Sequence, residues 1–98
     1  MTAEEEILKL VRMIPKGRVT TYKIIAEKMG KKFYRFVGSV CKKNPNLIST
    51  PCHRVVLSNG KVGGYKLGKF EKIKLLRSEG IEIENDKIKN FDKVLFKF

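Results

Sequence analysis

Cysteine and histidine are scarce in this sequence, which contains Cys41, Cys52 and a single histidine, His53. Two thiols are too few for a disulfide framework, and we therefore expect a reducing, cytoplasmic setting. Two thiols and one imidazole also cannot complete a four-ligand zinc site without the help of carboxylates. We expect neither a bound metal nor any other cofactor.

Long apolar runs and targeting segments are also missing. No stretch approaches the roughly 20 apolar residues that cross a bilayer, so we expect no membrane insertion. The first six residues are acidic and have no apolar core, which predicts that there is no signal peptide. The chain shows no repeat, and its 98 residues leave room for one domain, 1–98.

Acidic residues are few compared with basic ones. Lys and Arg number 22 against 10 Asp and Glu, which gives a formal net charge of +12 and a pI near 9.9. Such an excess on so small a surface attracts a polyanion. Nucleic acid is the first candidate partner, and an acidic membrane surface is the alternative.

The first half of the chain has the pattern of three helices. Thr2 and Glu5 form a capping-box pattern at the start of the first one. A second helix is expected to follow residues 20–21 and to end at Gly30, and a third is expected over 32–42. Two short helices joined at a glycine are typical of a helix-turn-helix, although any small helical bundle has such joints. The third helix is expected to turn one apolar face inward, formed by Phe33, Phe36, Val37 and Val40.

The second half of the chain mixes extended and helical patterns. We expect a strand over 53–57, a tight turn with Asn-Gly over 58–61, a helix over 69–78 and a hairpin over 81–89 that turns at Asn85-Asp86. The helix is expected to face inward with Phe70, Ile73 and Leu76. The predicted fold is α+β: a small, mostly helical domain with a winged-helix-like helix-turn-helix and short β-hairpins.

The run Pro51-Cys52-His53-Arg54-Val55-Val56 is the most informative stretch. A cysteine nucleophile must be a thiolate, and a nearby imidazole can take its proton directly or through a water. Neighbouring residues in a strand point to opposite faces, so Cys52 and His53 can approach each other only if the backbone bends, as Pro51 would allow. From this pair alone, a buried structural cysteine beside a solvated histidine is the simpler interpretation.

This run resembles the active-site signature of the O6-alkylguanine-DNA alkyltransferases, also called methylated-DNA–protein-cysteine methyltransferases. Three further segments resemble the helix-turn-helix elements of that family, and the resemblance extends from about residue 7 to residue 83. The segments are Arg18-Val19-Thr20-Thr21-Tyr22, Arg35-Phe36-Val37-Gly38 and Asn44-Pro45.

The resemblance implies roles for four residues in the chemistry. Cys52 matches the cysteine that accepts the alkyl group, His53 would deprotonate it through a water, and Glu79 would orient the imidazole. Tyr22 matches the tyrosine that hydrogen-bonds the extruded guanine and helps it to leave as a neutral species. Without the resemblance, Glu79 would be read as a solvated helix-end carboxylate and Tyr22 as an ordinary half-buried tyrosine.

The resemblance also implies how DNA is bound. Arg35 matches the residue that fills the base stack after extrusion of the damaged nucleotide, with the helix in the minor groove. Asn44 matches the residue that braces this helix against the active-site loop, and Cys41 is expected to be a small core residue. Four flanking lysines could hold phosphates, and a merely solvated basic face is their alternative reading: Lys31, Lys32, Lys42 and Lys43. The expected pocket residues are Val55, Tyr65 and Lys66, together with Lys72, whose role the resemblance leaves open.

The function that the resemblance implies is DNA repair by a single-turnover reaction, in which a monomer acts on double-stranded DNA containing O6-alkylguanine. Fuller members of the family carry an amino-terminal domain that is not expected in this chain. The alternative is a non-catalytic alkyltransferase-like protein that binds the lesion and recruits other repair factors. Those relatives replace the nucleophilic cysteine, whereas Cys52 is present here. A helix-turn-helix regulator that reads sequence in the major groove is disfavoured, because the third helix offers Arg35 among aromatic and lysine residues.

Overall fold

The computed structural model of the chain describes residues 2–30, 34–47 and 49–98. Two of the expected DNA-contacting residues, Lys31 and Lys32, lie outside these ranges. Among the described residues, no helix is both long enough and apolar enough to cross a membrane.

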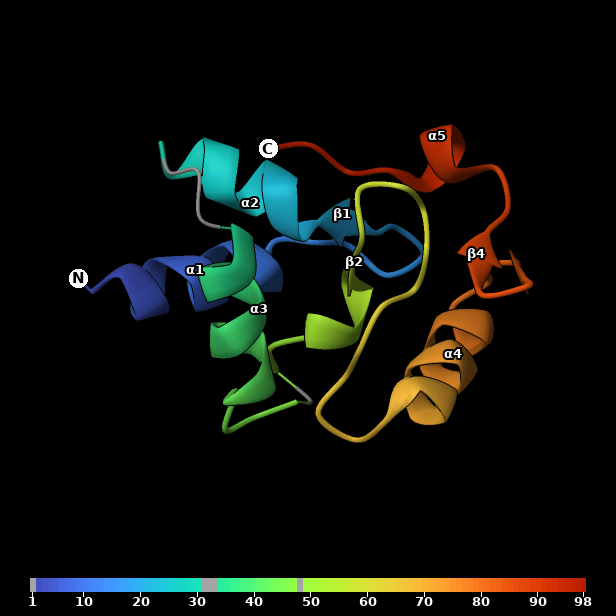
Figure 1. Cartoon of the computed structure of the whole chain (residues 1–98), viewed down its shortest axis with the longest axis horizontal. Helices are drawn as coiled ribbons and strands as arrows, with labels where there is room; N and C mark the ends of the chain where they lie inside the picture. The colour runs from blue at the N-terminus through green and yellow to red at the C-terminus, as the bar shows by residue number, and fades with distance from the viewer. Residues whose placement is uncertain (1, 31–33, 48) are drawn as a thin grey trace.

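Three helices form the amino-terminal half of the molecule (Figure 1): α1 (Ala3–Arg12), α2 (Tyr22–Lys28) and α3 (Tyr34–Lys42). The predicted capping box is confirmed, because Thr2 Oγ1 accepts a hydrogen bond from the backbone N–H of Glu5 at 3.1 Å and the Glu5 carboxylate accepts one from Thr2. Both α1 and α2 pack on α3. This arrangement confirms the expected helix-turn-helix within a mixed α+β fold.

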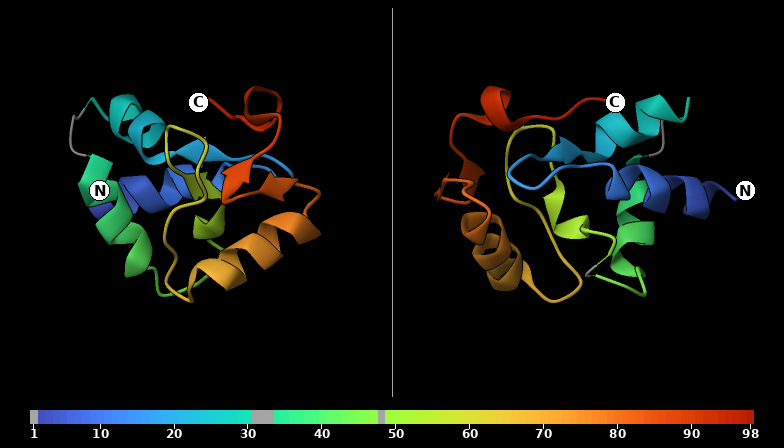
Figure 2. Two further views of the ribbon diagram at one scale, coloured as in Figure 1. Left: turned by 45° about the vertical axis from the view of Figure 1, so that its right-hand side comes forward. Right: turned by 180° about the vertical axis from the view of Figure 1, so that it is seen from behind.

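Two short parallel strands lie at the centre of the molecule (Figure 2): β1 (Thr20–Thr21) and β2 (Val55–Val56). The end of the chain returns to β1 after the short helix α5 (Phe91–Val94). There the backbone N–H of Val19 donates to the Val94 carbonyl at 2.9 Å, and Arg18 Nη2 donates to the Leu95 carbonyl at 2.7 Å. These bonds cover the side of β1 that faces away from β2.

The expected strand over 53–57 is wrong in its first half. Cys52–Arg54 forms a 3₁₀ turn, η1, and only β2 is extended. The proline ring holds Pro51 at a φ of −79°, and the backbone N–H of Arg54 donates to the Pro51 carbonyl at 3.0 Å. The bend allowed by Pro51 is therefore present, and it places Cys52 and His53 in a turn instead of on opposite faces of a strand.

The hairpin predictions are half right. A turn follows β2, with the backbone N–H of Gly60 donating to the Leu57 carbonyl at 3.0 Å, but β2 pairs with β1 and not across that turn. The later hairpin is confirmed as β3 (Ile83–Glu84) paired with β4 (Lys87–Ile88). Its turn residues Asn85 and Asp86 have φ values of 50° and 67°, as a type I′ turn requires.

Two aromatic residues expected in the core lie at the surface. Phe36 on α3 is 42% exposed, and Phe70 on α4 (Lys69–Ser78) is 92% exposed. On α4 the buried side chains are those of Lys72 and Leu76, one turn apart on the same face. Lys72 is buried where the apolar pattern predicts Phe70. It can be buried because hydrogen-bond acceptors from other segments surround its ammonium group.

Candidate active site

Cys52 is held at the start of η1 by a buried amide. Its side chain is 2% exposed, and Asn44, which is 1% exposed, donates from Nδ2 to the Cys52 Sγ at 3.1 Å. The same Nδ2 donates to the Thr50 carbonyl at 2.8 Å. Asn44 lies just beyond α3, so this contact connects the end of the helix to the segment that carries the thiol.

The surroundings of Cys52 favour its thiolate. The neighbouring Cys41 thiol lowers the pKa of Cys52, and the hydrogen bond from Asn44 and the positive charges of Lys72 and Lys66 act in the same direction. Burial opposes them, but the pKa of Cys52 remains below its usual value. A thiolate is the form of cysteine that acts as a nucleophile.

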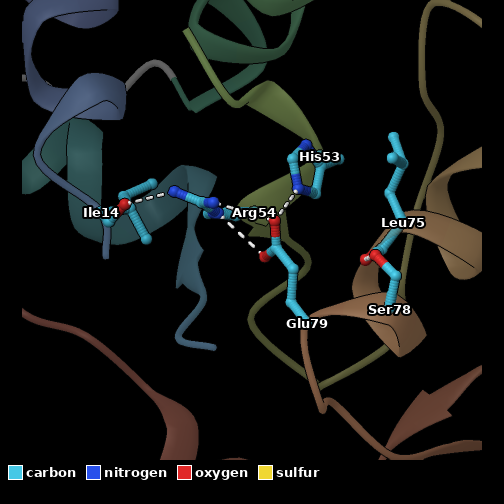
Figure 3. Close-up of polar contacts among 6 residues, drawn as sticks. All are labelled: Ile14, His53, Arg54, Leu75, Ser78 and Glu79. Atoms are coloured by element: carbon cyan, nitrogen blue, oxygen red, sulfur yellow. Dashed lines mark hydrogen bonds and ion pairs between the residues drawn. The ribbon is translucent and has the colours of Figure 1, made fainter. Parts of the chain in front are cut away.

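His53 and Arg54 both bind the carboxylate of Glu79 (Figure 3). His53 Nε2 lies 2.8 Å from Glu79 Oε2, and the Arg54 guanidinium donates to both carboxylate oxygens at 2.9 and 2.8 Å. A further Arg54 nitrogen donates to the Ile14 carbonyl at 2.8 Å. Glu79, at the end of α4, is therefore fixed by a bidentate partner that is itself anchored to the segment after α1.

The protonation states in this group leave His53 able to accept a proton. Burial acts to raise the pKa of Glu79, but hydrogen bonds from Arg54 and His53 outweigh it and hold that pKa below its usual range. An ionised carboxylate only accepts hydrogen bonds, so Nε2 of His53 carries the proton and Nδ1 is the basic nitrogen. Nδ1 is buried and has no hydrogen-bond partner among the described residues.

Lys72 joins four segments of the site. Its side chain is fully buried, and its Nζ lies 2.6 Å from the Val55 carbonyl, 3.0 Å from the Gly64 carbonyl and 3.4 Å from the Tyr22 hydroxyl. Burial lowers the pKa of Lys72 to about 8, so the ammonium form predominates at neutral pH. Burial also raises the pKa of Tyr22, which keeps its phenol protonated and able to donate.

A narrow space leads from Cys52 towards the surface. Tyr22, Cys41, Tyr65 and Lys66 line it, and its volume of about 10 Å³ is close to that of a single water site. The Tyr65 ring meets the His53 ring edge to face at 6.4 Å, and Lys66 Nζ donates to the Asn44 carbonyl at 2.9 Å. Side chains on both sides of the thiol therefore close the space around it.

A larger cavity of about 500 Å³ lies over α3, next to the narrow space, and shares Tyr22 with it. Arg35, Lys42 and Lys43 line this cavity and are all exposed. The structure thus places three of the five expected DNA-binding residues together.

A second hollow, of about 470 Å³, reaches His53 and Glu79 and includes Arg12 and Leu47. Among the described residues, no group of three or more His, Cys, Asp and Glu side chains could hold a metal ion.

The sequence of this chain matches a family model described as "6-O-methylguanine DNA methyltransferase, DNA binding domain" over residues 2–81. The chain belongs to this family.

Curated relatives of this methyltransferase-family chain are longer than it is. A methylated-DNA–protein-cysteine methyltransferase from Saccharolobus islandicus is 47% identical over 77 residues, which are 79% of this chain and 50% of the relative. A bifunctional methyltransferase/endonuclease from Picrophilus torridus is 42% identical over 83 residues, which are 84% of this chain and 28% of the relative. The chain thus spans about half of the first relative and less than a third of the second.

Solved structures of similar proteins agree with this family membership. S. pombe Atl1 in complex with damaged DNA containing O6-carboxymethylguanine has a TM-score of 0.84 at 28% identity, and the match covers 97% of this chain and 94% of that one. Mycobacterium tuberculosis OGT in complex with DNA has a TM-score of 0.76 at 36% identity over 81% of this chain and 50% of that one. The O6-methylguanine-DNA methyltransferase of Pyrococcus kodakaraensis has a TM-score of 0.74 at 35% identity, and the match covers 83% of this chain and 47% of that one.

Two residues of the site escaped the sequence analysis. Arg54 stands next to His53 in the run over 51–56, but only the fold reveals that it shares the carboxylate of Glu79 with the imidazole. Cys41 is expected only as a small core residue, and it is indeed buried, but it also lines the same narrow space as Cys52. No sequence spacing signals either contact, because each joins segments that meet only in the folded chain.

The protonation of His53 can be measured directly, because it is the only histidine. Burial lowers the pKa of His53, and the Glu79 carboxylate partly offsets this effect. We expect NMR titration of the imidazole to give a pKa below the usual value of about 6.5. Glu79→Gln should lower it further, because it removes a negative charge and leaves Arg54 in place. A pKa above 6.5, or an increase in Glu79→Gln, would contradict this description of the site.

Proposed function

We propose that this chain binds double-stranded DNA containing O6-alkylguanine, extrudes the damaged base and transfers its alkyl group irreversibly to Cys52. The observation that supports this most strongly is the arrangement around the thiol. A buried cysteine with a lowered pKa stands beside a histidine held by an ionised carboxylate, and the space at the thiol lies next to a basic cavity over α3.

The transfer itself needs four groups of the chain. The proton of the Cys52 thiol passes through a water to Nδ1 of His53, whose positive charge Glu79 stabilises. The thiolate then attacks the alkyl carbon, a carbon–sulfur bond forms, and the bond between that carbon and O6 breaks. The electron pair of that bond leaves with guanine, and the Tyr22 phenol donates to the base as its negative charge develops. The thioether that forms on Cys52 is not removed, so each protein molecule acts once.

Extrusion of the base is a geometric requirement of this reaction. The alkyl carbon of a stacked base cannot reach a side chain that is 2% exposed. We propose that Arg35 fills the gap in the stack from the minor groove, while Lys42 and Lys43, with Lys31 and Lys32, hold phosphates. The space at Cys52 is too small for a guanine, so the loop that carries Tyr65 must move when the base enters.

The alternative function is non-catalytic recognition of the lesion. Its support is the likeness to S. pombe Atl1 over 97% of this chain, in a structure that holds DNA with O6-carboxymethylguanine. Against it stands the presence of a buried Cys52, held by Asn44, together with a His53 that is held by Glu79, because binding alone requires neither.

The test is the intact mass of the protein after it is mixed with a duplex that contains one O6-methylguanine. We expect the mass to increase by one methyl group, on Cys52, and the reaction to stop at one per protein molecule. The matched control is Cys52→Ala, which should bind the damaged duplex without any gain in mass. Selective binding of the wild-type protein without methylation would contradict transfer and favour the alternative, and methylation of Cys52→Ala would contradict the choice of acceptor.

Arg35→Ala should impair the extrusion of the base but not the transfer of the alkyl group to Cys52. Arg35 is exposed on α3 and is not among the residues that contact Cys52, so its loss should slow repair of duplex DNA more than reaction with free O6-alkylguanine base. Single-turnover rates on the two substrates measure this difference. Lys93→Ala, which removes one exposed charge on α5 far from α3, controls for the loss of charge alone. Equal losses on the two substrates would contradict the proposed role of Arg35.

A further inference from the structure

A second thiol lies against the proposed nucleophile. Cys41, in the last turn of α3, is 6% exposed and belongs to the same core cluster as Cys52. Both thiols are free and line the same narrow space, and each shifts the pKa of the other. The proposed reaction uses only one of them, which leaves the contribution of Cys41 to be explained.

The direction of a hydrogen bond between the two thiols follows from the other neighbours of the pair. A thiol can donate or accept, and the thiol that more readily loses its proton becomes the acceptor. Cys52 already accepts from Asn44 Nδ2, and the positive charges of Lys66 and Lys72 act on it. A hydrogen bond donated by Cys41 would keep the proton of the pair on Cys41, and the pKa values shift in that direction, upward for Cys41 and downward for Cys52.

We propose that Cys41 is a positioning residue for alkyl transfer, whose S–H donates to the Cys52 sulfur and holds it as a thiolate facing the narrow space. This proposal rests on the proposed function. Cys41 keeps its own proton throughout the reaction, while the proton of Cys52 leaves through the water to His53. After transfer the Cys52 sulfur is a thioether, which accepts hydrogen bonds only weakly, so the contact stabilises the reactive form more than the alkylated form.

Several groups besides Cys41 face the Cys52 sulfur and influence its titration. They come from the elements packed around it: Tyr22 of α2, Asn44 after α3, Tyr65 and Lys66 of the following loop, and Lys72 of α4. All of them remain in place when only Cys41 is substituted. The contribution of the second thiol can therefore be isolated by a change at that one position.

The test measures the rate at which iodoacetamide alkylates Cys52 in the free protein at each pH, with peptide mapping to separate the two cysteines. Cys41→Val keeps an apolar side chain at this position, one methyl group bulkier than the thiol, but removes the donor. We expect the midpoint of its pH profile to move upward, with alkylation about tenfold slower at pH 7. Cys41→Ser keeps a donor and should restore the midpoint to near the wild-type value.

The control for packing is Val40→Ala, since Val40 is the adjacent residue of α3, is also 6% exposed and belongs to the same cluster. We expect Val40→Ala to lower the melting temperature without moving the midpoint. The proposal is overturned if Cys41→Val has the wild-type midpoint, if Cys41→Ser shifts as far as Cys41→Val, or if Val40→Ala shifts equally.

Because iodoacetamide requires no DNA, this experiment can fail independently of the proposed function. Methyl transfer from the damaged duplex, measured from pH 6 to 9 in the same variants, should follow the same order as alkylation. A shift seen with iodoacetamide but no methyl transfer by the wild-type protein would contradict the proposed function and leave the thiol contact standing. Methyl transfer with an unchanged midpoint in Cys41→Val would contradict only the role of Cys41.

Discussion

The buried ammonium group of Lys72 is the constraint on which the arrangement of the site depends. A charged group that is fully buried is costly unless every donor finds an acceptor. Here the acceptors are the carbonyls of Val55 and Gly64 and the hydroxyl of Tyr22, which belong to β2, the pocket loop and α2. Because α4 carries the lysine, a displacement of any of these segments would leave part of the ammonium group unpaired. One side chain therefore fixes the relative positions of Tyr22, the loop with Gly64 and the segment that continues from Cys52 to Val55.

The charges of the site are divided so that the thiol and the imidazole have different tasks. Two lysines and an amide surround Cys52 and favour its thiolate. The carboxylate of Glu79 lies on the other side of the imidazole, where Arg54 binds both of its oxygens and keeps it ionised. A carboxylate placed directly beside Cys52 would instead oppose the thiolate. Positive charge therefore acts on the thiol, whereas the negative charge of Glu79 acts on the imidazole.

Features of the fold that depend on neighbouring residues could be predicted from the sequence, and those that depend on distant ones could not. The capping box at Thr2 and the turn at Asn85-Asp86 are local, and both are confirmed. The burial of Lys72 in place of Phe70 was missed, because apolar periodicity assigns no core position to a lysine whose acceptors come from three other segments. The strand expected over 53–57 begins only at Val55, because its valine-rich part dominates the local pattern while the preceding residues belong to the turn that follows Pro51. The candidate site was indicated by the resemblance of one short run and a few matching positions, whereas the partners of that run, Arg54 with Glu79 and Cys41 with Cys52, required the fold.

We propose that an alkylated base enters the closed space between Tyr22 and Tyr65 and presents its alkyl carbon to residue 52. The most direct measurement is a crystal structure of Cys52→Ala bound to a duplex that contains one O6-methylguanine. We expect the base to be extruded, its methyl carbon to point at residue 52, the Tyr22 hydroxyl to donate to the base and Arg35 to lie in the stack. A lesion that remains stacked in the duplex, or a base bound away from residue 52, would overturn this proposal.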